Sequence, residues 1–115
     1  MSKYNSRKTV MNGIPFDSKK EACRFGELLL LERSGEIKDL KLQPEFTIQE
    51  AFKTAHGETV RAVRYRADFS YLRWVKEGVD TRWEPVVEDV KGYRTKDYEI
   101  KRKLMLGQGV KVVEI

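Results

Sequence analysis

The most constraining feature of this 115-residue chain is the alternation of apolar and polar side chains over residues 60–72. From Val63 to Tyr71, every second residue is aromatic, aliphatic or alanine, and charged or polar residues stand between them. Successive side chains of a β-strand point to opposite faces of its sheet, so this alternation predicts a strand that buries one face. The rest of the chain must supply neighbouring strands and a layer that covers the apolar face.

Two helices are expected, one on each side of this strand in the sequence. Residues 19–33 are predicted to be helical because Ser18 can cap the first turn, Glu21 completes a capping box, and Gly35 follows the end. Residues 96–106 form the second predicted helix, between Thr95 as the cap and a closing glycine.

Shorter segments complete the expected order of elements. A hairpin is expected around Asn12-Gly13, the dipeptide that type I′ turns favour. Further strands are expected over residues 37–42, 45–52, 85–91 and 110–115. This order predicts an α/β fold with a central mixed β-sheet flanked by helices.

Length and charge narrow the class of protein. The length fits a single domain over residues 1–115, with a flexible basic N-terminal arm at about residues 1–9. The 23 Lys and Arg residues against 18 Asp and Glu give a net charge of +5, which makes a polyanion the first partner to consider. No apolar run approaches the roughly 20 residues of a membrane span and no signal peptide is evident, so we expect a cytoplasmic protein.

The sulfur and indole side chains suggest no chemistry. Cys23 is the only cysteine, which excludes a disulfide framework. A nucleophilic pair of Cys23 with His56 is disfavoured against a small buried thiol and an exposed loop imidazole. We expect Trp74 and Trp83 to pack in the core or a dimer interface.

Two predicted strands carry the residues that could perform chemistry. Asp68 stands in the alternating strand, and Asp89 and Lys91 share one face of the strand over residues 85–91. If these strands are neighbours, the two carboxylates and a backbone carbonyl would make an oxygen site suited to Mg²⁺. A lysine beside it could hold the attacking water or stabilise charge on a phosphoryl oxygen. The alternative is an ordinary set of solvent-exposed charges on the sheet.

Glu21 adds a third carboxylate, on the same helical stripe as the apolar Phe25. A carboxylate at the rim of an apolar stripe either caps the helix or faces a cleft, and both are compatible. Together with Asp68, Asp89 and Lys91 it resembles the PD-(D/E)xK nuclease superfamily. The chain is also similar to a family of small bacteriophage proteins related to archaeal-type Holliday-junction-resolving enzymes. Segments at residues 3–5, 12–22, 35–40, 43–46, 65–69 and 87–92 carry this resemblance.

The resemblance implies a restriction-endonuclease-like core and a homodimeric endonuclease that resolves four-way DNA junctions by paired symmetric nicks. It implies Mg²⁺ as the cofactor, with Mn²⁺ as a substitute, and the cytoplasm of an infected host as the location if a phage encodes the protein. The implied catalytic residues are Glu21, Asp68, Asp89 and Lys91, and the implied metal ligands are Asp68, Asp89, the Val90 carbonyl and Glu21. Ala67 replaces the proline of the motif, and Asp89 replaces its more frequent glutamate, which shortens the metal-binding arm.

Basic residues outside this set would bind the DNA backbone, which gives affinity without sequence readout. They are Lys3, Arg7 and Lys8 in the arm, which also contains Tyr4 as a DNA-binding candidate, and Arg94, Lys96, Lys101, Arg102 and Lys103 near the second helix. For the helix residues, an ordinary solvated face is the alternative. Two other functions stay open: a nuclease of the same superfamily that acts on flaps or ends, and a non-catalytic basic DNA-binding module of recombination whose carboxylates only support the fold.

Overall fold

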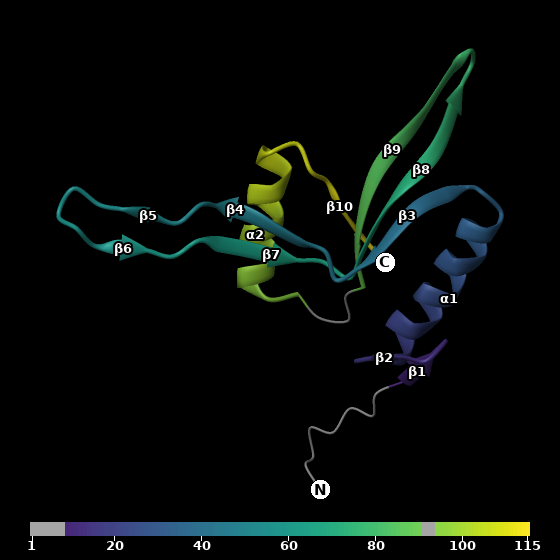
Figure 1. The fold of residues 1–115 in the computed structure, drawn as a ribbon, viewed down its shortest axis with the longest axis horizontal. Coiled ribbons are helices and arrows are strands. Elements are labelled where there is room, and N and C mark those ends of the chain that lie inside the picture. Colours follow the sequence, from purple (N-terminus) through teal and green to yellow (C-terminus); the bar gives the residue numbers. More distant parts are fainter. Residues whose placement is uncertain (1–8, 91–93) are drawn as a thin grey trace, which may run out of the picture. The chain divides into compact units, whose positions relative to one another are not determined.

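The computed structural model describes residues 9–90 and 94–115 (Figure 1). Its elements, in chain order, are β1 (Thr9–Met11), β2 (Ile14–Phe16), α1 (Lys19–Arg33), β3 (Ile37–Leu42), β4 (Glu45–Gln49), β5 (Phe52–Lys53), β6 (Thr59–Val60), β7 (Val63–Arg66), β8 (Phe69–Glu77), β9 (Asp80–Asp89), α2 (Lys96–Gly107) and β10 (Val112–Glu114). They group into two compact units. The first unit holds the described residues up to Leu40 and Tyr71–Glu84, and the second holds Lys41–Ser70 and the described residues of Pro85–Ile115.

The first unit contains the predicted hairpin and the first predicted helix. Asn12 and Gly13 have φ angles of 55° and 82°, as a type I′ turn between β1 and β2 requires. The hydroxyl of Ser18 accepts a hydrogen bond from the N–H of Glu21 at 3.1 Å, so this cap starts α1 at the predicted residue. The hairpin lies beside the start of α1 (Figure 1), where the Phe16 and Phe25 rings pack with centroids 5.1 Å apart.

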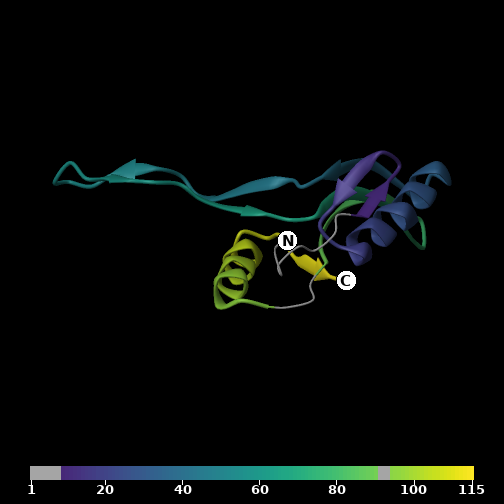
Figure 2. The same cartoon turned by 90° about the horizontal axis from the view of Figure 1, so that it is seen from below.

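The second unit is built on an antiparallel ribbon. Strands β4 and β7 pair along this ribbon, and the short β5 and β6 extend it. Helix α2 packs on one side of it (Figure 2), where the side-chain amide of Gln108 donates to the carbonyl of Ile48 at 2.6 Å. The buried core of this unit consists of Tyr65, Ala67, Val87, Tyr98, Met105 and Val112.

A four-stranded sheet has the order β10-β9-β8-β3. Strand β10 runs parallel to β9, with Val112 opposite Val87. Strands β8 and β9 are joined by the two residues 78–79, a connection that only antiparallel neighbours can have. The sheet is therefore mixed, and together with two helices it confirms the predicted α/β class.

The prediction of one long strand over residues 60–72 is wrong. These residues belong to three separate strands, β6, β7 and the start of β8. The cause is a change of partner near Asp68. The N–H of Ala67 donates to the carbonyl of Pro44 at 3.0 Å, whereas the N–H of Asp68 donates to the carbonyl of Glu88 at 3.1 Å. The alternation itself is confirmed, since Tyr65, Ala67, Phe69 and Tyr71 are all buried.

Other boundaries also differ from the predictions. The segment over residues 45–52 is interrupted at residues 50–51 and forms β4 and part of β5, and the last strand covers only Val112–Glu114. Strand β9 begins five residues earlier than predicted and ends at Asp89. Cys23 is exposed rather than buried. Neither α1 nor α2, the helices within residues 9–90 and 94–115, has the length and apolar character that crossing a membrane requires.

Candidate active site

Asp68 stands where the chain leaves its pairing with β4 and joins β9. Its N–H donates to Glu88, as above, and its carbonyl accepts from the N–H of Gln43 at 2.9 Å. These bonds fix its backbone on both sides. Its carboxylate oxygen Oδ2 accepts a hydrogen bond from the N–H of Val90 at 2.6 Å. The Asp68 carboxylate therefore adjoins the segment that follows Asp89.

The end of β9 buries two consecutive carboxylates. Glu88 is 1% exposed and Asp89 is 2% exposed. Adjacent strand residues point to opposite faces, so these two side chains enter different environments. Oδ2 of Asp89 accepts a hydrogen bond from the hydroxyl of Tyr65, and its carbonyl accepts from the N–H of Ile115 at 3.0 Å. Burial of a carboxylate is costly without such partners, so the tyrosine helps to hold Asp89 in place.

Tyr65 connects the two predicted metal-binding aspartates. Burial raises the pKa of its hydroxyl well above the ordinary value. The hydrogen bond to Asp89 and the negative charges of Asp89 and Asp68 raise this pKa further, because they oppose a phenolate. The hydroxyl therefore stays protonated and donates to Asp89.

A second tyrosine–carboxylate pair lies in the same unit. The hydroxyl of Tyr98 donates to Glu114 at 3.0 Å, and burial followed by this bond raises the pKa of Tyr98. Glu114 also pairs with Arg94, and with Arg102 at 3.8 Å. Two of the arginines predicted to bind DNA therefore share one carboxylate.

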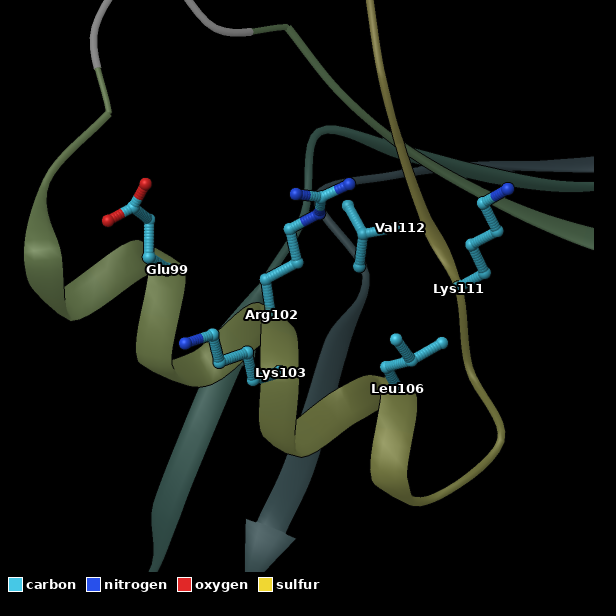
Figure 3. Close-up of a pocket in the computed structure, with 6 residues that line it drawn as sticks. All are labelled: Glu99, Arg102, Lys103, Leu106, Lys111 and Val112. Carbon is cyan, nitrogen blue, oxygen red and sulfur yellow. The ribbon is translucent and has the colours of Figure 1, made fainter.

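Arg102 also lines a hollow of about 280 Å³ between α2 and β10 (Figure 3), together with Glu99, Lys103, Leu106, Lys111 and Val112. In this view the side chains of Lys103 and Lys111 extend to opposite sides, away from one another. The hollow is basic, but its ammonium groups do not converge on one point.

The remaining predicted residues are dispersed or lie outside the described residues. Glu21 is on α1 in the first unit, half-buried, where its N–H bonds to Ser18. Lys96 is exposed at the start of α2, and Lys101 pairs with Asp97 at 3.5 Å. The predictions for Lys3, Tyr4, Arg7, Lys8 and Lys91 fall outside the residues that the structure describes.

Sequence reasoning missed Tyr65 and Tyr98 as parts of the site. Each fits the apolar pattern of its element and therefore reads as a core residue. The one signal in the sequence is chemical, because a buried tyrosine hydroxyl usually requires a polar partner. The tertiary structure decides which carboxylate accepts this hydrogen bond.

The candidate donors fit Mg²⁺ in their chemistry. Within residues 9–90 and 94–115, no three His, Cys, Asp or Glu side chains are grouped so that they could hold a metal ion. Mg²⁺, however, is commonly bound through one or two carboxylates with waters and substrate phosphates. Asp68, Asp89 and the carbonyl of Val90 supply hard oxygen donors of this kind.

The fold and the site define a small α/β protein in which a buried aspartate, Asp89, accepts from a tyrosine hydroxyl, and a second aspartate, Asp68, accepts from the N–H of Val90, the residue that follows Asp89. Residues 1–112 match the family described as "Protein of unknown function (DUF1064)", and the chain belongs to that family. No curated protein and no solved structure matches the chain.

Proposed function

We propose that this chain is a Mg²⁺-dependent DNA endonuclease with a restriction-endonuclease-like core, which resolves four-way junctions by paired nicks as a homodimer. The observation that carries the proposal is the 2.6 Å hydrogen bond from the N–H of Val90 to the carboxylate of Asp68. It joins the first acidic residue of the PD-(D/E)xK pattern to the segment that contains the second.

In this proposal Asp68 and Asp89 hold the metal, with the Val90 carbonyl as a further ligand. When bound, Mg²⁺ would supply charge stabilisation for the phosphoryl oxygens and lower the pKa of a bound water. Tyr65 keeps the carboxylate of Asp89 in one orientation through its hydroxyl. Lys91 orients the attacking water or stabilises charge on the phosphoryl oxygen. The resemblance also assigns Glu21 to the acidic set, and because Glu21 belongs to the first unit, its role stays a prediction.

The homodimer follows from the reaction. One site of this kind cuts one strand, whereas resolution takes two cuts related by two-fold symmetry. A dimer with C₂ symmetry provides that arrangement. Light scattering on the free protein and on its junction complex tests it, and a monomer in both states would favour a general nuclease.

One observation favours the non-catalytic alternative. Asp89 is almost completely buried and already bonded to Tyr65, as a carboxylate with a purely structural role would be. A basic DNA-binding module of recombination would then need no metal.

The decisive experiment compares a labelled four-way junction with a linear duplex and a flap of matched sequence, each with Mg²⁺ and with EDTA. We expect paired symmetric nicks in the junction, in Mg²⁺ only. Cutting confined to flaps or ends would replace the resolvase by a general nuclease. Tight junction binding with no cutting in Mg²⁺ or Mn²⁺ would leave the non-catalytic module.

A further inference from the structure

A second hollow in the second unit adjoins the candidate site. Its volume is about 490 Å³, and its walls carry three cations, Arg64 and Arg66 from β7 and Lys101 from α2, together with the carboxylates of Glu45 and Asp97. Tyr65 and Tyr98 also line it. Since the Tyr65 hydroxyl donates to Asp89, one side chain belongs to both the hollow and the candidate metal site.

The cations of the hollow differ in how firmly they are held. Arg64 pairs with Glu45 at 3.7 Å and Lys101 pairs with Asp97 at 3.5 Å. Both pairs are long, and the carboxylate of each is solvent-exposed, so they contribute little and are readily exchanged for another anion. Arg66 has no ion pair with any of the described residues, although it is exposed on the same face of β7 as Arg64. Its guanidinium is the cation most available to a ligand.

We propose that this hollow binds a DNA backbone phosphate next to the scissile one, with Arg66 as its main contact and Arg64 and Lys101 as support. The proposal rests on the nuclease function and names how the strand reaches the site. Carboxylates repel a polyanion, so a strand at Asp68 and Asp89 requires cations close by. The planar guanidinium of arginine can donate two parallel hydrogen bonds to a phosphate, which fixes orientation as well as position.

The hollow of Figure 3 is a weaker candidate for this role. Its arginine is engaged by Glu114, and its two lysines diverge. The hollow beside Tyr65 combines an available arginine with a lining residue, Tyr65, whose hydroxyl donates to Asp89.

Binding of a four-way junction, measured in EDTA between about 50 and 200 mM KCl, tests the proposal without cutting. Loss of one phosphate contact lowers the slope of log K against log[salt] by about 0.9. We expect Arg66→Ala to show this loss. Arg66→Lys should restore the slope but not the full affinity, because it keeps the charge and loses the paired hydrogen bonds. Arg82→Ala is the charge-matched control, since Glu77, Asp80 and Glu84 already surround Arg82.

An unchanged slope in Arg66→Ala, or an equal loss in Arg82→Ala, would overturn the proposal. If Arg66→Ala does not fold by circular dichroism, Arg66→Gln takes its place with the same expected loss. This test is separate from the nuclease test. A wild type that binds but never cuts refutes the nuclease alone, whereas a wild type that cuts while Arg66→Ala keeps its slope refutes the phosphate contact alone.

Discussion

Strand β9 carries acidic residues in both halves, and the two halves differ in how far these residues are exposed to solvent. In the first half, the carboxylate of Asp80 is 66% exposed and pairs with Arg82 at 2.7 Å. In the second half, Glu88 and Asp89 are buried, and Asp89 accepts a hydrogen bond from the hydroxyl of Tyr65. An exposed pair costs little to form and contributes little, whereas a buried carboxylate is expensive unless every neighbour accommodates it.

The comparison extends to the aromatic neighbours. Near the first half, Trp83 packs against Trp74 with centroids 5.1 Å apart, and the ammonium of Lys38 lies 4.4 Å above its ring. Trp74 remains 44% exposed, so it is not a core residue of the single chain, and its alternative place in a dimer interface stays a prediction. The aromatic neighbour of the second half is Tyr65, which is 4% exposed and whose hydroxyl donates a hydrogen bond to Asp89 inside the core. The buried half is where a substitution should have the greatest consequence.

The largest expected difference is between Asp89→Asn and Asp80→Asn. Asparagine keeps the shape of the side chain and an oxygen that accepts from Tyr65, but it removes the charge that would hold Mg²⁺. We therefore expect Asp89→Asn to abolish junction cutting and to retain junction binding, and Asp68→Asn to behave in the same way. Asp80→Asn should cut as the wild type does. Rates of junction cutting in Mg²⁺ check both results, and normal cutting by Asp89→Asn would remove the site assignment.

A smaller but still large loss is expected for Lys91→Ala, just beyond the buried half of β9. If its ammonium stabilises charge that develops on the phosphoryl oxygen, its removal should slow cutting about 10²–10³-fold. Lys76→Ala is the matched control, because Lys76 is exposed on β8. Single-turnover cutting by both variants measures the effect. Equal rates for the two would show that the lysine of the motif is an ordinary surface residue.

The sequence predicts the helices and strands of this fold well, but it does not predict where a segment changes the strand with which it pairs. Helix α1 begins and ends at the predicted residues because Ser18 and Gly35 are local signals that act through the backbone beside them. The break at Asp68 has no such signal. It arises because β4 and β9 compete for successive residues of one alternating stretch, and that competition exists only once the chain has folded.

The same reasoning applies to the candidate site. Asp89 can be selected from the sequence because a carboxylate in an apolar strand is unusual, and Asp68 because it stands in a predicted strand that could be its neighbour. Tyr65 cannot be selected, since its position in the alternating pattern is the same as that of an ordinary core residue. The first half of β9 was missed because its charges mask the strand pattern, although Arg82 bonds with carboxylates on both sides of the turn.

Tyr65→Phe tests whether the buried half depends on its hydroxyl. Loss of the donor leaves Asp89 buried without that bond, so we expect a loss of about 1–3 kcal/mol in the free energy of unfolding near pH 7. The pKa of Tyr65 lies above its ordinary value of 10.0, so the folded state keeps a proton that the unfolded chain releases near that pH. The stabilising contribution is therefore complete below pH 10 and declines as the pH rises above 10.

Urea unfolding at several pH values from 8 to 11 measures this contribution. The wild type should lose stability above pH 10 more steeply than Tyr65→Phe, by up to roughly 1.4 kcal/mol per pH unit. Parallel curves for the two proteins would show that the hydroxyl is not protected by Asp89 and Asp68.

The smallest effect is expected for Arg82→Ala, in the exposed half. Its guanidinium is bonded to three carboxylates, but all of these groups face solvent, where water and salt replace such pairs readily. We expect the melting temperature to change by no more than about 3 °C, and the difference from the wild type to vanish in 1 M salt, where charges are screened beyond about 3 Å. Thermal melting followed by circular dichroism at both salt concentrations measures it. A loss as large as that of Tyr65→Phe would mean that β9 relies on its charges along its whole length, and burial would no longer distinguish its two halves.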